Sequence, residues 1–245
     1  MIETLNRIAK LSLCAIALLL PARSVFAQAA PTAVSLTPFQ SNSGHLPLNI
    51  GVLVQGGFGL TENRGGFKFL MAGARAGKVL TGNKGPGLLH GNFEYGAEIF
   101  PFWQSYTPKF QRAFCTAPND CSQTYTVGGT FTGVSITPII LRWNFTGSHR
   151  ITPWFQGAGG VLWTNHKYPA FGGPPYNVIN DGPNADASVW NFTPQGGIGA
   201  HYFITPRRSI DLGMNAVHIS SASLGDRNPG VNASLQFSLG YSWWK

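Results

Sequence analysis

Residues 210–221 read IDLGMNAVHISS, and the alternation in this stretch decides how the rest of the chain is interpreted. Apolar side chains occupy every second position, which is the period of a β-strand: Ile210, Leu212, Met214 and Ala216. The same parity then carries His218 and Ser220. Residues two apart on a strand share one face, with about 6 to 7 Å between their Cα atoms. If this face meets lipid, a polar pair on it indicates function.

The start of the chain has the three parts of a secretory signal peptide. Arg7 and Lys10 supply the basic part, residues 11–20 the apolar part, and Val25-Phe26-Ala27 a small-residue cleavage site. An apolar run of this length is too short to cross a bilayer as a helix. We therefore expect an exported protein whose signal peptide is residues 1–27.

The rest of the chain is expected to have two parts. Residues 28–47 are rich in Ala, Pro, Ser and Thr and predict a flexible periplasmic lead, and residues 48–245 predict one folded domain. Without the signal peptide, 14 basic and 8 acidic residues remain, so the net charge is +6. The cations are not clustered, which argues against nucleic acid as a partner and favours an anionic membrane face.

The composition after residue 27 is typical of a transmembrane β-barrel. Only 11% of the whole chain is charged and 43% is hydrophobic, yet no run in the exported part is long enough for a membrane helix. Eight alternating segments fall at about 48–60, 66–79, 89–99, 128–145, 151–164, 190–204, 210–220 and 231–244. Long polar loops are expected at 103–126 and 165–188. The sequence thus predicts an all-β, eight-stranded antiparallel barrel in the bacterial outer membrane, and a soluble β-sandwich is the alternative.

Strand parity predicts which side chains face lipid. The segment from Leu48 places Ile50, Val52 and Val54 outward, and the next segment places Phe67, Phe69 and Met71 outward. An eight-stranded barrel has an interior that side chains just fill, so a pore is not expected. Glycine pairs at 56–57, 159–160 and 196–197 are interpreted as relief of crowding inside this narrow barrel.

Two carboxylates of the third segment, Glu94 and Glu98, are predicted to face inward together. Pairing with interior cations (Arg142, Arg75 or Lys68) is one interpretation, and a glycosidase-like acid pair is the other. The pair Cys115 and Cys121 predicts a local disulfide in an oxidising compartment. No metal site and no cofactor are expected.

The stretch around His218 resembles the lipid A 3-O-deacylases, the PagL-like outer-membrane enzymes within the acyloxyacyl hydrolases. That family carries His-x-Ser-Asn near the end of the penultimate strand and an acidic residue fourteen positions after the His. Here His218-Ile219-Ser220 matches the first part, and residues 228–232 (Asn-Pro-Gly-Val-Asn) match the later segment. The resemblance implies that Ser220 is the nucleophile, that His218 is its general base, and that no metal is needed.

The chain departs from the family pattern at three positions. Asn232 stands where the family has Glu, so either Asn232 orients His218 or another acid such as Asp226 takes that role. Ser221 replaces the Asn that follows the serine, which leaves its part in an oxyanion hole open, and Ser223 replaces a Gly.

Two functions follow from the sequence. The first is an esterase that removes an ester-linked 3-hydroxyacyl chain from lipid A in the outer leaflet, where lipopolysaccharide is the partner. The second is a non-catalytic barrel that serves as an anchor, adhesin or structural protein. The sequence leaves open whether the protein forms a homodimer.

Overall fold

The computed structural model describes residues 37–40, 45–61, 64–114, 123–147, 149–168, 188–222, 224 and 233–245. These residues belong to one unit of the chain, Ser35–Lys245. Its elements, in chain order, are η1 (Pro38–Gln40), β1 (Leu48–Gly59), β2 (Lys68–Val79), η3 (Gly87–Leu89), β3 (Gly91–Phe114), β4 (Gln123–Phe145), β5 (Ile151–Tyr168), β6 (Ser188–Phe192), β7 (Gln195–Thr205), β8 (Arg208–His218) and β9 (Ala233–Trp244).

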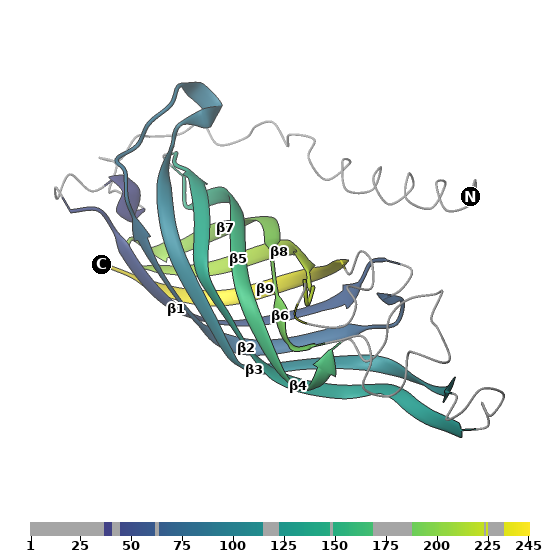
Figure 1. Ribbon diagram of the computed structural model, residues 1–245. Helices are drawn as coiled ribbons and strands as arrows, with labels where there is room; N and C mark the ends of the chain where they lie inside the picture. Colours follow the sequence, from purple (N-terminus) through teal and green to yellow (C-terminus); the bar gives the residue numbers. More distant parts are fainter. Residues whose placement is uncertain are drawn as a thin grey trace, which may run out of the picture. The chain divides into compact units, whose positions relative to one another are not determined.

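The strands close into an antiparallel barrel (Figure 1). The sheet order is β4-β3-β2-β1-β9-β8-β7-β5-β6, and pairing of β4 with β5 completes the circle. β6 and β7 are two parts of one course, separated by Thr193 and Pro194, because a proline has no N–H for the ladder. The fold is therefore the eight-stranded barrel that the sequence predicts. Among the described residues, no helix is long and apolar enough to span a membrane.

Alternation along β1 has the predicted direction. Ile50, Val52 and Val54 are exposed on the outer surface, whereas Asn49 and Gln55 are buried in the interior. The prediction for β2 was wrong: Phe69 and Met71 are buried inside the barrel, as is Phe67 just before the strand. The error arose because aromatic residues were expected only on the lipid face, whereas the barrel interior around the start of β2 is itself apolar.

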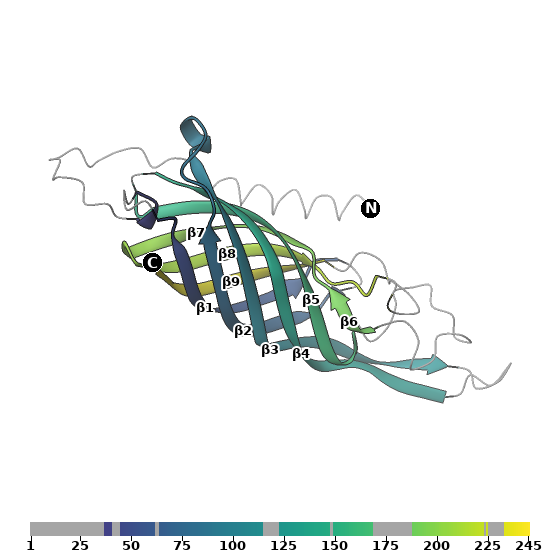
Figure 2. The same ribbon diagram turned by 60° about the vertical axis from the view of Figure 1, so that its left-hand side comes forward.

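The expected polar loop at 103–126 is also wrong over most of its length. β3 continues to Phe114 and β4 begins at Gln123, so these strands form a hairpin that extends beyond its neighbours (Figure 2). The pairing shifts between Phe100 and Trp103 and between Thr107 and Phe110, where Pro101 and Pro108 stand. Bulges accommodate prolines in a ladder, and each bulge interrupts the alternation that identifies a strand in sequence.

Charged and amide side chains fill the middle of the interior. Glu94 accepts hydrogen bonds from Asn49 and Asn144 at 2.9 Å and lies 3.7 Å from Arg75 and 3.6 Å from Arg142. This confirms interior ion pairing for Glu94. Asp211 lies 4.0 Å from Arg75 and 2.6 Å from the Nδ1 of His201.

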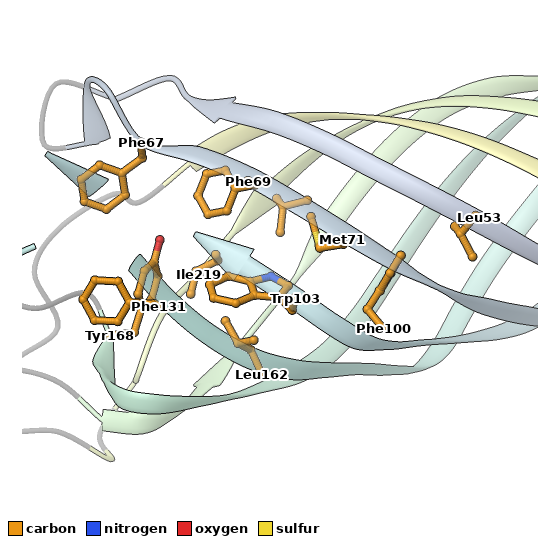
Figure 3. Packing of buried hydrophobic residues seen from close by; sticks show 11 residues of the cluster. Leu53, Phe67, Phe69, Met71, Phe100, Trp103, Phe131, Leu162, Tyr168 and Ile219 are labelled. Atoms are coloured by element: carbon orange, nitrogen blue, oxygen red, sulfur yellow. The ribbon is translucent and has the colours of Figure 1, made fainter. Parts of the chain in front are cut away.

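Apolar clusters close the interior on both sides of this polar layer. At the end where β3 and β4 extend, aromatic and aliphatic side chains pack together, among them Trp103, Phe131 and Tyr168 (Figure 3). At the other end Phe39 of η1 packs edge-on against Phe203 and Trp244, with ring centroids 5.6 and 5.2 Å apart. The short β4–β5 and β7–β8 turns lie at this second end, called the short-turn end below, and such turns face the periplasm in outer-membrane barrels.

Candidate active site

His218 is the last residue of β8, and its side chain lies on the outer surface. Its neighbours Val217 and Ile219 are buried at 5% and 4% exposure and belong to the interior apolar cluster, where Ile219 points toward Trp103 (Figure 3). Since side chains alternate along a strand, burial of Val217 and Ile219 places His218 on the outward parity. Ser220 lies beyond the end of β8 and is buried, at 7% exposure.

Backbone hydrogen bonds join both residues to the segment where the strand is interrupted between β6 and β7. The N–H of His218 donates to the carbonyl of Pro194 at 3.0 Å. Ser220 exchanges two bonds with Phe192, at 2.7 and 3.0 Å, and forms an isolated bridge. Pro194 interrupts the strand between β6 and β7, and the chain after β8 continues to pair beyond this interruption. The backbone is therefore restrained at both His218 and Ser220.

The serine lies at a sharp turn that leaves the barrel wall. The Ser220 hydroxyl oxygen accepts a hydrogen bond from the N–H of Ala222 at 3.1 Å. Ala222 has a φ of 50°, in the left-handed region that costs a residue with a Cβ roughly 1–2 kcal/mol. Backbone strain of this kind often accompanies functional sites, and here it directly follows the candidate nucleophile.

The remaining predicted site residues divide into two groups. Ser221 is described and is buried at 1% exposure, directly after Ser220. Asn232, Asp226 and the cysteines Cys115 and Cys121 lie outside the described residues. No described residue forms a hydrogen bond to the imidazole of His218, and the described part of the chain contains no cluster of three metal-ligating side chains.

Next to His218, toward the short-turn end, the barrel surface has almost no side chains. The register aligns Gly157 of β5, Gly196 of β7 and Ala216 of β8 in one outward row. A Cβ added at Gly157 would meet no atom within 4 Å, and one at Gly196 would meet only the carbonyl of Gln156 at 3.8 Å. We call this row, Gly157-Gly196-Ala216, the bare row.

The glycine pairs therefore have two different roles. A Cβ at Gly197 would lie 1.9 Å from the side chain of Asn215, and a Cβ at Gly160 would lie 2.6 Å from the carbonyl of Ile136. These two glycines therefore relieve crowding. Gly159 and Gly196 instead open the outer surface. Strand parity predicts this split, because consecutive residues of a strand face opposite sides.

The bare row leads into an apolar groove of about 750 Å³ on the outer surface. Phe155, Ile198, Met214 and Phe237 form its nearest outward row, directly below the bare row in the register. On the opposite side of His218, Trp163 of β5 pairs with Trp190 of β6, and both rings are exposed. Exposed tryptophans of this kind mark the boundary between lipid and water.

The length of β8 places His218 near this boundary. Ten residue steps lead from Arg208, at the short-turn end, to His218. At about 3.3 Å per residue and a tilt of about 40°, they rise about 25 Å, the height of the apolar band of an outer-membrane barrel. At this height His218 lies near the outer boundary of the apolar band.

Comparison with protein families matches residues 91–242 to the family described as Lipid A 3-O-deacylase (PagL). Comparison with curated protein sequences found no match. Among solved structures, Neisserial surface protein A (NspA) is 12% identical with a TM-score of 0.47, and the match covers 80% of this chain and 96% of the NspA chain. The outer membrane enzyme PagL is 17% identical with a TM-score of 0.39, and covers 79% and 97%. The N-terminal β-barrel domain of Pseudomonas aeruginosa OprF is 10% identical with a TM-score of 0.36, and covers 80% and 97%.

Proposed function

Because the chain belongs to the lipid A 3-O-deacylase (PagL) family of outer-membrane hydrolases, we propose that it cleaves the ester at the 3-O position of lipid A with Ser220 as nucleophile and His218 as general base. The substrate is lipid A in the outer leaflet, and the product released is a 3-hydroxy fatty acid. The observation that supports the proposal is the outward His218 near the lipid boundary, followed two residues later by Ser220 at a sharp turn. A polar group on the lipid face of a barrel is costly unless it has a function.

The surface beside the pair fits the acyl chain of such a substrate. The bare row begins next to His218 and continues into the apolar groove. An extended acyl chain could lie across Gly157 and Gly196 without meeting a side chain, and its end could contact Ile198 and Met214. The exposed Trp163 and Trp190 lie on the other side, where the sugar of the lipid would be. This arrangement supports a substrate with one polar and one long apolar part.

The chemistry follows the ordinary course of serine ester hydrolysis. The Ser220 Oγ attacks the ester carbonyl carbon while the His218 imidazole takes its proton. The bond from that carbon to the sugar oxygen then breaks, and the imidazolium returns the proton to this oxygen. A water molecule, deprotonated by His218, then attacks the acyl-Ser220 ester; the carbon–Oγ bond breaks, the imidazolium returns the proton to Ser220 Oγ, and the fatty acid leaves.

A third group is needed to orient the imidazole, and we assign this role to Asn232. It lies fourteen residues after His218, the spacing of the family's acidic residue, and an Asn can orient a histidine without supplying charge. Ser221, directly after the nucleophile, is our candidate for an oxyanion contact.

Mass spectrometry of lipid A from cells that produce the protein tests the proposal. We expect the loss of one 3-hydroxyacyl chain, and no loss when the cells produce Ser220→Ala. Unchanged lipid A in the presence of folded wild-type protein would reject the esterase and favour the non-catalytic barrel. Equal deacylation by the Ser220→Ala variant would keep the activity but reject the assigned nucleophile.

A further inference from the structure

The short-turn end carries a rim of exposed cations, and no described acidic side chain lies among them. Lys78 and Lys84 flank the β2–β3 turn, Arg150 the β4–β5 turn, Arg207 and Arg208 the β7–β8 turn, and Lys245 follows β9. Among the described residues, the carboxylate side chains are Glu94, Glu98 and Asp211, and all three are buried inside the barrel. The rim is therefore a strongly positive surface that the proposed deacylase chemistry does not use.

Part of this rim faces the surrounding lipid and not the water below it. The register pairs Leu48 with Lys78 on one side, and backbone bonds of 2.9 and 2.8 Å join Leu48 to Lys245 on the other. All three residues share the outward parity of the exposed Ile50. Lys78 and Lys245 therefore lie about 10 Å apart, two strand spacings, on the lipid-facing surface.

Exposed aromatic rings stand beside these cations. Lys78 pairs with Tyr95 of β3, and Arg208 pairs with Trp243 of β9. Trp243 is 47% exposed and packs edge-on against Tyr241 at 4.9 Å. Exposed tyrosine and tryptophan on a membrane protein lie at the level of the lipid headgroups. A cation in the same row can therefore reach a headgroup phosphate.

We propose that Lys78, Arg208 and Lys245 form a binding surface for anionic phospholipid headgroups in the leaflet around the short-turn end. Each cation near a membrane surface attracts anionic lipid, and the long side chains can extend from the apolar wall to the phosphates. A soluble acidic partner fits less well, because the three residues occupy outward strand positions beside exposed aromatic rings; the Lys78 Nζ also donates to the carbonyl of Leu46 at 2.6 Å. The contact would also hold the barrel at a fixed depth, with His218 at the opposite boundary.

Native mass spectrometry of the full chain in detergent, titrated with phosphatidylglycerol or phosphatidylcholine, tests this proposal. We expect phosphatidylglycerol to bind several-fold more tightly, with a preference that falls as salt increases. The variant K78Q/R208Q/K245Q should bind both lipids about equally. The control K68Q/K109Q/K167Q removes the same charge from exposed lysines toward the other end of the barrel, and it should keep most of the preference.

Three results would overturn the proposal: no preference in the wild-type protein, an unchanged preference in K78Q/R208Q/K245Q, or equal losses in the two triple variants. Equal losses would mean that binding follows net charge and not position on the rim. Circular dichroism checks folding, and the single variants K78Q and R208Q replace the triple if it does not fold. The assay measures no hydrolysis, so its outcome is independent of the proposed deacylase activity.

Discussion

At the scale of single residues, the site depends on one constrained turn. Ser220 is held by its bridge to Phe192, and the next turn places Ala222 in the left-handed region so that its N–H reaches the serine hydroxyl. A Cβ is unfavourable in this conformation, yet the position is not glycine. We interpret the alanine as a compromise that limits the freedom of the turn after the nucleophile.

Ala222→Gly tests this interpretation. The substitution removes the strain but adds backbone freedom, and these effects are of similar size, so the free energy of unfolding should change by less than about 1 kcal/mol. We expect turnover of lipid A to fall several-fold, because the Ser220 hydroxyl loses its fixed position. Ala222→Asn, which tolerates the left-handed region and keeps a side chain, should retain activity. Full activity in Ala222→Gly would contradict the assigned role of the turn.

Asn232→Glu tests the third catalytic group. A carboxylate would stabilise the imidazolium that forms when Ser220 attacks, and the wrong partner in a triad can lower turnover by about 10⁴. We therefore expect a rise in kcat of at least several-fold in an assay of fatty acid release. Ser220→Ala should abolish activity in both backgrounds. No effect of Asn232→Glu, together with loss of activity in Asp226→Asn, would assign the acid to Asp226.

At the scale of elements, the paired strands create a surface that no single strand contains. Gly157, Gly196 and Ala216 come from three strands, and only the register brings them into one row beside His218. Their neighbours in sequence face inward, where space is short: a Cβ at Gly197 would lie 1.9 Å from Asn215. Two adjacent glycines of β7 thus serve opposite faces of the wall.

Gly196→Leu should block the bare row without harming the barrel. The added side chain points into open space, so we expect little change in the free energy of unfolding. Hydrolysis of lipid A should fall at least tenfold, whereas hydrolysis of a short-chain soluble ester should change little, because such an ester does not need the groove. Ala76→Leu is the control, since Ala76 is exposed on the outward face of β2 and its register partners Ile50 and Ala97 do not line the groove. Equal losses on both substrates would mean that the row does not hold the acyl chain.

At the scale of the whole molecule, a polar interior layer joins strands on opposite sides of the barrel. Glu94 of β3 contacts Arg75 of β2 and Arg142 of β4, and Arg75 reaches Asp211 of β8. In a closed, water-poor interior, a charge that loses its partner is costly. The layer is therefore expected to stabilise closure of the barrel more than any single surface contact does.

Glu94→Gln should destabilise the barrel by about 3–5 kcal/mol, because the guanidinium of Arg142 loses its carboxylate and that of Arg75 keeps only Asp211. The new amide would also point an N–H group toward the amide of Asn49 or Asn144. Urea unfolding in detergent or vesicles measures the effect. Glu98→Gln is the control: Glu98 is similarly buried, but no described cation lies within 4.0 Å of its carboxylate, so its loss should be smaller. Equal losses would show that the ion pairs of Glu94 add no stability.

The sequence alone determined the all-β class, the eight-strand barrel and the outward parity of His218. These features depend on a period of two, which is visible whenever one face of a strand meets lipid and the other a polar interior. The same logic failed for Phe67, Phe69 and Met71, because the barrel interior around the start of β2 is apolar and not polar. Prolines at bulges similarly concealed the long β3–β4 hairpin.

Only the tertiary structure decided which residues from different strands meet. The bare row beside His218, the bridge from Ser220 to Phe192 and the lipid-facing row of Lys78 and Lys245 all depend on register. Register is set by the closure of the whole barrel and by its bulges, and a shift of one residue would move every side chain to the other face. Alternation within a strand is a local property and can be read from the chain, whereas the alignment between strands is a property of the closed sheet.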